Sequence, residues 1–559
     1  MIRKITLAAS VALLAGCGGG DINIQPTNVD NSVDNSTNTG GGGSTNPCAN
    51  YTDPASNTVV QGTFDGSNCT YTSDFVGVNN PLTVDLVIPF ISGVHIFEDG
   101  LFVGENVDSG PAPQEGEGPT LTIRAGNTLA FLDSQDYVLV NRGSQIIAQG
   151  SPSAPITFTA FSDAVTGTAG PEDVSLWGGI QINGNGITNN CTDAERANDQ
   201  CHVLTEGQPS NYGGDNNTES SGVLSYVVTK HSGFEVVPGD ELNGITLNAI
   251  GSGTQMDHIE VYSTFDDGLE WFGGAVEVEK VVMLYVRDDS LDYSDGFVGG
   301  ITDALVIHPR TDGNRCIEAD SIGQGRFDDG EALDLAPITN PTVTGLTCIP
   351  SGFDDGTHGD SEGPLLRLGA RSQIRNMLVF GGYAVTANGD NNECFEIQDP
   401  EDEDTGLPVS DVTRLAAQNG AVTVTGSVIA CLDPAEAAKG ELPNGDALDL
   451  WVTDSGTADY GFNTVAFDDD DDPATPDVVV ENVIELDPNN ANTSILAAND
   501  YRTAGYDADA DTTTITLSDG VTTVTIPGRL GAVSTSDDWT GGWTFGLKPA
   551  NRAQPLYFE

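Results

Sequence analysis

The stretch HIEVYSTFDDGLE at residues 258–270 decides the fold, because two later stretches repeat its pattern. VVMLYVRDDSLD follows at 281–292, and ALVIH at 304–308 leads to RCIEAD at 315–320. Each unit contains two short apolar runs separated by a polar turn, and the equivalent acidic positions are 22 and 26 residues apart. This period, filled with strand-forming residues, is typical of a parallel β-helix, in which every coil stacks its strands on those of the next coil.

Short strand-forming runs separated by Gly, Asn and Pro continue upstream, at residues 121–123, 128–131, 138–140, 144–148, 155–158, 179–182 and 244–247. Residues 435–439, after a proline, are the one short stretch with a helical pattern. A β-sandwich or a β-propeller also uses short strands. The repeat is shorter than a four-stranded blade, however, and Asn-Gly hairpin signals are sparse.

We therefore predict an all-β chain whose body is a right-handed parallel β-helix. The helix is expected at residues 119–400, after an N-terminal cap region at 48–118. Residues 401–559 are expected to form further coils, acidic inserts and a C-terminal cap. Length alone would predict three or four domains of about 150 residues each, but a solenoid needs no such division.

The charge of the chain excludes one large class of function. Its 559 residues include 83 Asp and Glu against 20 Lys and Arg, which gives a formal net charge of −63. A surface this negative repels the phosphate backbone of nucleic acids. Nucleic-acid binding is therefore not expected.

The first residues indicate export. Arg3 and Lys4 precede an apolar run at residues 5–14, which is too short to span a bilayer and has the layout of a secretory signal. The run ends in LAGC at 14–17, which resembles a bacterial lipobox. The resemblance implies cleavage before Cys17 and acylation of that residue, with palmitate among the acyl chains. The alternative is an ordinary signal peptide with an incidental cysteine. Gly at position 18 favours the outer membrane over the inner one. The sequence leaves open which face of that membrane the protein occupies.

Residues 18–47 are rich in Gly and Asn and have almost no apolar content, so they are expected to be a flexible tether. Eight cysteines remain after Cys17, an even number that fits disulfides in an exported protein. Because neighbours in sequence are neighbours in space in a coiled stack, we predict nearest-neighbour pairs: Cys48 with Cys69, Cys191 with Cys201, Cys316 with Cys348, and Cys394 with Cys431. The scattered histidines and the absence of Cys-x-x-Cys argue against a structural zinc site.

The repeated acids raise an electrostatic question. If Glu270, Asp292 and Glu318 stack on successive coils, neighbouring carboxylates lie about 4.8 Å apart and repel by about 3.5 kcal/mol at an effective dielectric of about 20. Carboxylate oxygens without Cys or His favour Ca²⁺. We predict one or more Ca²⁺ ions and no organic cofactor, with ligands from Asp266, Asp267, Glu270, Asp288, Asp289, Asp292, Asp295, Glu318 and Asp320. The alternative is solvated turn aspartates whose charge Arg287 and Arg315 share.

Several motifs together resemble a known family. They are WGGI at 177–180, DDGLEWFGG at 266–274, DDSLDY at 288–293, CIEAD at 316–320 and DWTGGW at 538–543. The combination is similar to Gram-negative outer-membrane lipoproteins, a family that includes a major spirochaete surface lipoprotein and many proteobacterial members. The resemblance covers roughly residues 120–400 and the last twenty or so. It implies a β-helix at the outer membrane and no particular chemistry.

Catalysis finds little support in the motifs. GDSEG at 359–363 matches a nucleophile elbow, but its flanks are acidic and no histidine follows Ser361. The sequence around His358 approaches the Gly-His-Gly of polygalacturonases without completing it. Lys280, Arg287 and Arg310 supply residue types that a polysaccharide lyase needs, without a recognisable arrangement.

We therefore expect a lipid-anchored outer-membrane or surface lipoprotein with a structural or binding role, stabilised by Ca²⁺. One alternative is an accessory that captures a ligand, such as an extracellular polysaccharide, for an outer-membrane transporter. Its stacking platforms would be tryptophans such as Trp177, Trp271, Trp539 and Trp543, although Trp in such motifs more often caps the core. The second alternative is a polysaccharide lyase or glycosidase.

Overall fold

The computed structural model describes residues 46–207, 210–353, 356–381, 393–398, 401–402, 407–408, 412–431, 440–457, 460–468, 506–507, 511–516, 521, 523–533 and 538–556. The predicted signal peptide, Cys17, nearly all of the predicted tether and the expected helix at 435–439 lie outside these residues. The predicted N-terminal cap region at 48–118 lies wholly within them.

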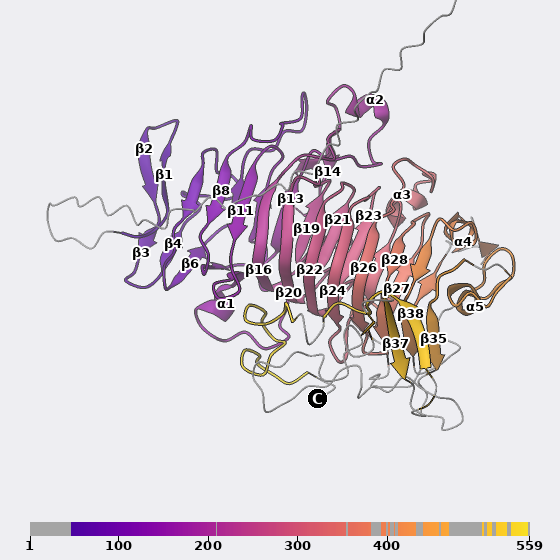
Figure 1. Ribbon diagram of the computed structural model, residues 1–559. Helices are drawn as coiled ribbons and strands as arrows, with labels where there is room; N and C mark the ends of the chain where they lie inside the picture. The colour runs from indigo at the N-terminus through magenta and orange to yellow at the C-terminus, as the bar shows by residue number, and fades with distance from the viewer. Residues whose placement is uncertain are drawn as a thin grey trace, which may run out of the picture. The chain divides into compact units, whose positions relative to one another are not determined.

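Two stacks of parallel strands form a β-helix, as the sequence predicted (Figure 1). In the first stack each coil adds one strand in chain order, and every pairing is parallel. Its nine strands are β7 (Leu101–Val103), β10 (Tyr137–Val140), β13 (Gly179–Asn183), β19 (Ile245–Asn248), β21 (Leu269–Phe272), β23 (Leu291–Ser294), β25 (Arg315–Ala319), β27 (Glu362–Leu366) and β30 (Glu396–Ile397).

The second stack is a sheet of 18 strands in the described part of the chain, in which only β3 pairs antiparallel, with β4. They are β3 (Thr63–Phe64), β4 (Cys69–Tyr71), β5 (Leu86–Ile88), β6 (Val94–Phe97), β8 (Thr120–Ile123), β9 (Thr128–Phe131), β11 (Gln145–Gln149), β12 (Ile156–Ala160), β16 (Gly222–Ser232), β20 (Gln255–Thr264), β22 (Glu277–Val286), β24 (Gly300–Ile307), β26 (Thr342–Ile349), β28 (Gln373–Arg375), β29 (Leu378–Phe380), β33 (Thr423–Thr425), β34 (Val428–Cys431) and β35 (Val465–Asp468). Parallel pairing runs from β4 with β6 to β34 with β35, so it extends beyond both ends of the range 119–400.

The long strands of the second stack bend at left-handed residues, and one column of such residues runs through four coils. Tyr226, His258, Lys280 and Asp303 have φ of +52°, +54°, +59° and +58°. They occupy equivalent places in β16, β20, β22 and β24, because the residues on either side of each are in register. The bend divides every coil into two strand directions, as shown by β16, whose two halves pair with β11 and with β12.

Short elements decorate the coils. The antiparallel strands are β1 (Asn50–Asp53) with β2 (Thr58–Gln61), β14 (Val203–Leu204) with β15 (Asn211–Tyr212), β17 (Phe234–Val237) with β18 (Asp240–Leu242), β31 (Glu401–Asp402) with β32 (Leu407–Pro408), and the sheet of β36 (Tyr506–Asp507), β37 (Thr512–Thr516) and β38 (Thr523–Pro527). The helices are α1 (Phe161–Ala164), α2 (Asp193–Arg196), α3 (Gln324–Asp328), α4 (Val412–Gln418) and α5 (Leu448–Val452). None of these helices has the length and apolar content needed to cross a membrane.

The core lies inside the coils and is set by the alternation of side chains along each strand. In β21, Leu269 and Trp271 are fully buried, while Glu270 between them points to the other face. Trp177, Trp539 and Trp543 are buried as well, so the tryptophans fill cores and do not form surface stacking platforms. This confirms the capping interpretation of these residues.

Three disulfides join cysteines that are neighbours in the sequence. Cys48–Cys69, Cys191–Cys201 and Cys316–Cys348 are bonded as predicted. Cys394 is also disulfide-bonded, and the side chain of Cys431, its predicted partner, lies outside the described residues.

The segment 538–556 covers the outer face of the second stack. The amide of Phe545 donates to Oε2 of the buried Glu260 at 2.7 Å, and the ring of Trp543 meets Tyr226 edge-on at 5.7 Å between centroids. The DWTGGW motif therefore acts as part of a second hydrophobic core outside the coils.

Candidate metal centre

The predicted stacking of three acids is confirmed by the strand register. Glu270 of β21 lies opposite Asp292 of β23, and Asp292 lies opposite Glu318 of β25. Thr246 precedes Glu270 in this column and Leu365 follows Glu318, so the ladder has three acidic rungs. It stands on the outer face of the first stack.

A second column runs beside the ladder in the turns that precede these strands. The amide of Asp267 donates to Oδ1 of Asn243 at 3.0 Å, and the amide of Asp289 donates to Oδ1 of Asp267 at 3.0 Å. The amide of Arg315 in turn donates to Oδ1 of Asp289 at 2.7 Å. Asn and Asp recur here because a short side chain with an acceptor oxygen can bond the backbone of the next coil.

The two columns bring carboxylates into close groups. In each of four triads, three potential ligand atoms all lie within 4.8 Å of one another: Asp266–Asp288–His358, Asp267–Asp288–Asp289, Asp267–Glu270–Asp292 and Asp289–Asp292–Glu318. The side chains are sheltered from water, with Asp267 6%, Glu270 7% and Asp289 5% exposed. These buried acidic clusters could hold metal ions.

Asp292 connects two of the triads and is incompletely satisfied. Its Oδ1 atom is buried and has no hydrogen-bond partner among the described residues. A buried carboxylate oxygen without a donor is costly, and a cation shared with Glu270 or Glu318 would satisfy it.

Two basic side chains contact the cluster, each at a different place. Arg367 pairs with Glu318, and its Nε lies 3.0 Å from Oδ1 of Asp320. Nδ1 of His358 lies 2.8 Å from Oδ2 of Asp288.

The two arginines expected to share the charge form their ion pairs with other acids, although the charge of Arg315 still opposes the rise in the pKa of Asp289 and Glu318. The ion pair of Arg315 is with Glu362, and Nε of Arg287 lies 3.5 Å from Oδ2 of Asp312. In the described part of the chain, therefore, neither forms an ion pair with the acids of the ladder.

Burial raises the pKa of six acids in the cluster. The neighbouring carboxylates raise it further, as Asp292 does for Asp267 and Glu318 does for Asp289. The groups whose pKa lies well above the ordinary range are Asp266, Asp267, Glu270, Asp289 and Asp292. The pKa of Glu318 rises to about 7, since burial outweighs the nearby Arg367.

Two of the nine expected ligands lie apart from the triads. Asp320 is held by Arg367. Asp295 lies near the C-terminal end of β23, where Nη1 of Arg326 contacts its Oδ1 at 2.7 Å and Asn190 donates to its Oδ2.

The sequence reasoning missed several participants. Asn243 could have been found by aligning Asn243-Gly244-Ile245 with Asp267-Gly268-Leu269 of the next coil. Arg367 directly follows β27, in register with Asp320, so the strand repeat could have placed it. His358 comes from an irregular loop, and no sequence signal placed it here. A second group of Glu362, Glu393 and Glu396, next to Arg315, was also missed.

Comparison with known proteins agrees with this architecture. A family model described as a pectate-lyase-like beta helix domain matches residues 114–454, more than half of the chain. The chain belongs to this family. No solved structure matches it. The wider resemblance to outer-membrane lipoproteins stays a prediction.

One possible catalytic pair in this pectate-lyase-like β-helix is ruled out by burial. Nδ1 of His308 lies 2.7 Å from Oγ of Ser361, the serine of the GDSEG motif. Ser361 is 1% exposed and His308 is fully buried, and Nε2 of His308 faces the disulfide sulfur of Cys316 at 3.6 Å. A substrate cannot reach this pair, so it is a structural contact.

Proposed function

We propose that the protein is an exported, lipid-anchored β-helix of the outer membrane or cell surface whose acidic face binds Ca²⁺ and which serves a structural or binding role. The observation that carries the cation site is the surplus of sheltered carboxylates over bases. Asp267, Glu270, Asp289 and Asp292 converge without an ion-paired base among the described residues. Ca²⁺ is the preferred ion because all of these ligands are carboxylate oxygens, which it accepts in flexible geometry.

The site offers binding energy by two routes. A cation removes the repulsion between the stacked acids, and it supplies a partner for the orphan Oδ1 of Asp292. Because the ligands come from consecutive coils, the ion also joins these coils. Ca²⁺ binding should therefore stabilise the folded chain by mass action.

The test is a calorimetric Ca²⁺ titration of the full-length chain, with melting curves in Ca²⁺ and in chelator. We expect measurable heat and a higher melting temperature in Ca²⁺. Asp292→Asn should bind Ca²⁺ at least roughly tenfold more weakly, because the variant loses one charge-assisted contact with the ion. Glu279→Gln is the matched control, because Glu279 is an exposed acid on β22 of the same region. Absence of both heat and melting shift would remove the cation proposal.

Lipid anchoring is tested separately. Cys17→Ser should abolish labelling with radioactive palmitate and release the protein from the membrane fraction, whereas Cys48→Ser should keep the label. Retention of the label in Cys17→Ser would overturn the anchor.

A polysaccharide lyase is the second candidate, favoured by the family description alone. A lyase needs a free base beside its cation, and Arg315 and Arg367, which lie nearest the ladder, are both in ion pairs. Incubation with polygalacturonate and Ca²⁺ should therefore yield no ultraviolet-absorbing unsaturated product. Its appearance would replace the binding role by catalysis.

A further inference from the structure

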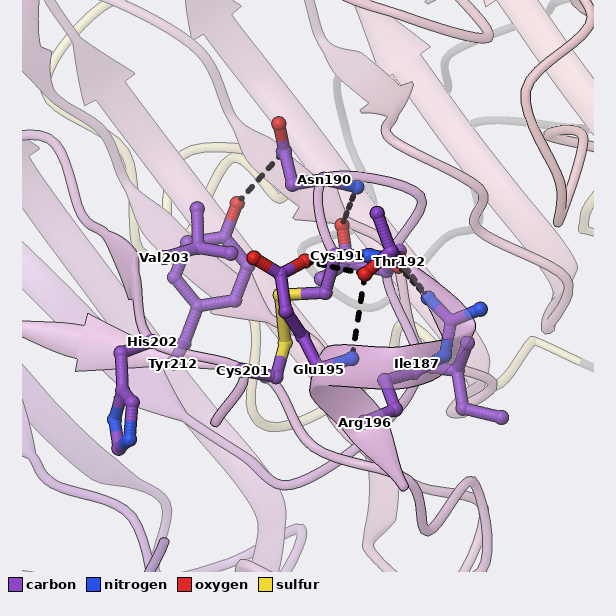
Figure 2. Close-up of a disulfide and its surroundings, with 12 residues drawn as sticks. Ile187, Asn190, Cys191, Thr192, Glu195, Arg196, Cys201, His202, Val203 and Tyr212 are labelled. Atoms are coloured by element: carbon purple, nitrogen blue, oxygen red, sulfur yellow. Dashed lines mark hydrogen bonds between the residues drawn. A yellow bond between two sulfur atoms is a disulfide. The ribbon is translucent and has the colours of Figure 1, made fainter. Parts of the chain in front are cut away.

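An insert between β13 and β16 is fastened over the outer face of the first stack. The disulfide Cys191–Cys201 closes it beside helix α2 (Figure 2). The buried Arg142 clamps it from below, since Nη1 donates to the carbonyl oxygens of Cys201 and Gly213, both at 2.8 Å. The disulfide and Arg142 thus hold the described part of the insert against the coils.

A small pocket lies between this insert and the strands. Its volume is about 180 Å³, and its lining comes from the insert (Asn190, Val203, Leu204, Thr205, Glu206 and Tyr212), from β19 (Asn248), from β21 (Phe272) and from the end of β23 (Asp295). Phe272 lies two residues after Glu270 on the same strand, so both point to the outer face. The pocket therefore adjoins the acidic ladder along this face.

Two aromatic rings form part of the pocket wall. The rings of Tyr212 and Phe272 are tilted by 45° with centroids 6.4 Å apart. Tyr212 is 2% exposed, and its hydroxyl accepts a hydrogen bond from Nδ2 of Asn190 at 3.4 Å. Aromatic faces carry negative electrostatic potential, which attracts cations.

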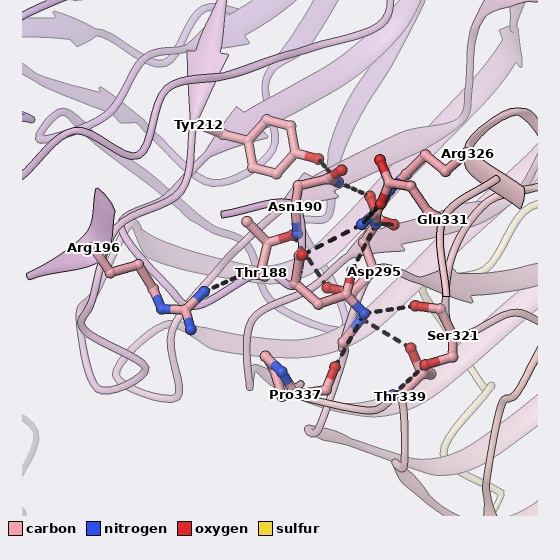
Figure 3. A network of polar contacts seen from close by, with 12 residues as sticks. Thr188, Asn190, Arg196, Tyr212, Asp295, Ser321, Arg326, Glu331, Pro337 and Thr339 are labelled. Carbon is pink, nitrogen blue, oxygen red and sulfur yellow. Dashed lines mark hydrogen bonds and ion pairs between the residues drawn. The ribbon is translucent and has the colours of Figure 1, made fainter. Parts of the chain in front are cut away.

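The polar network behind the pocket is already satisfied (Figure 3). Asp295 is bound by Arg326 on one oxygen and by Asn190 on the other. Both oxygens of Asp295 thus have a donor, so Asp295 needs no ligand. Nδ2 of Asn190 donates to both Asp295 and Tyr212, which leaves only the side-chain oxygen of Asn190 available, as an acceptor.

Glu206 is different. No donor or base among the described residues contacts its carboxyl group, and it is not one of the triad ligands. Glu241, Asp240 and Asp295 surround it, and together with burial they raise its pKa to about 8. The pocket thus combines aromatic faces, acceptor oxygens and an unpartnered carboxyl in a strongly negative field, which excludes anionic ligands.

We infer that this pocket is a binding site for a small organic ammonium ion, with its charge against Glu206 and its carbon substituents against Tyr212 and Phe272. Contact between an ammonium group and aromatic faces contributes about 0.5–2 kcal/mol in proteins. The pocket volume admits a cation the size of choline. The inference does not rest on the Ca²⁺ proposal, because none of the triad ligands lines the pocket.

The test uses choline as the cationic probe and 3,3-dimethylbutan-1-ol as its uncharged isostere, titrated into the full-length chain in chelator and followed by ligand-observed NMR and calorimetry. We expect choline to bind and the isostere to bind at least roughly tenfold more weakly. Equal binding of the two, or binding of D-galactose in place of choline, would overturn the inference. So would displacement of choline by Ca²⁺ in direct competition, since Ca²⁺ would then be the occupant.

Variants make the assignment residue by residue. Glu206→Gln and Phe272→Leu should each weaken choline binding by roughly tenfold, whereas Tyr212→Phe keeps the ring and should retain binding. Glu235→Gln on the neighbouring strand β17 removes the same charge from an exposed position and is the control. Circular dichroism and a cooperative urea transition in chelator show that the variants fold. Folded Glu206→Gln with unchanged choline affinity would contradict the site.

Discussion

The backbone amide of Asp289 donates to Oδ1 of Asp267 at 3.0 Å, so the carboxylate of one turn holds the next coil in place. The same atom pattern joins Asn243 to Asp267 one coil earlier. At each position of this column, the acceptor of the backbone hydrogen bond is the side-chain oxygen of either an amide (Asn243) or a carboxylate (Asp267). The negative charge of Asp267 is therefore not needed for the fold, which separates its structural role from its proposed role as a ligand.

Asp267→Asn should stabilise the protein in chelator and weaken its Ca²⁺ affinity. The amide oxygen keeps the hydrogen bond to Asp289, while the repulsion with Asp292 and Glu270 is removed. Asp267→Ala loses the bond as well and should cost about 1–2 kcal/mol of unfolding free energy. Urea unfolding in chelator measures both variants. If Asn and Ala destabilise equally, the hydrogen-bond account of the turn column is wrong.

Stability without Ca²⁺ should fall as the pH rises. Burial raises the pKa of Glu318 to about 7 and that of its neighbours in the ladder above the ordinary range, so the folded state binds protons that the unfolded chain has released. This contribution is fully present below about pH 4.3, the unfolded pKa of Glu, and is lost as the pH rises through about 7. Urea midpoints in chelator should therefore decline between about pH 5 and about pH 8.

Excess Ca²⁺ should flatten or reverse this decline, because the ion binds the deprotonated carboxylates. A decline of the same size with and without Ca²⁺ would mean that the ladder does not bind the ion. Glu279→Gln should leave both curves unchanged, whereas Asp292→Asn should reduce the decline in chelator.

Much of the ladder was predictable from sequence, since the pattern of apolar residues fixes which side chains face outward and the repeat fixes which ones stack. Glu270 and Asp292 follow directly from these two rules. Arg367 follows from the same repeat, because it directly succeeds β27 in register with Asp320. His358 and Glu206 do not, because they lie on a loop and an insert of irregular length. Their positions depend on contacts made after the coils have formed, and these contacts have no periodicity along the chain.

The disulfide Cys316–Cys348 should make a large contribution to stability. It joins residues 32 apart in sequence, and in the chain-entropy account a loop of this size contributes about 3–4 kcal/mol. Urea unfolding of the double variant Cys316→Ser and Cys348→Ser measures this contribution. The pair Cys191–Cys201 closes a separation of 10 residues, so its double variant should lose less, about 3 kcal/mol. A larger loss from the shorter loop would mean that strain or local packing outweighs loop closure.

Lys280 tests the bend that divides every coil. Its φ of +59° lies in the left-handed region, which Asn and Gly tolerate and β-branched residues resist. In the same column of bends the later coils have Gly345 at +71° and Asn376 at +55°. Lys280→Asn should therefore change the unfolding free energy by less than about 0.5 kcal/mol, whereas Lys280→Val should cost roughly 1–2 kcal/mol.

The control must be a substitution at an exposed position of the same strand. Val281 does not qualify, because it is buried in the core. The exposed Glu279 on the same strand serves instead, and Glu279→Val should be tolerated because extended backbone favours β-branched residues. Equal losses in Lys280→Val and Glu279→Val would show that the left-handed bend is not what limits this position.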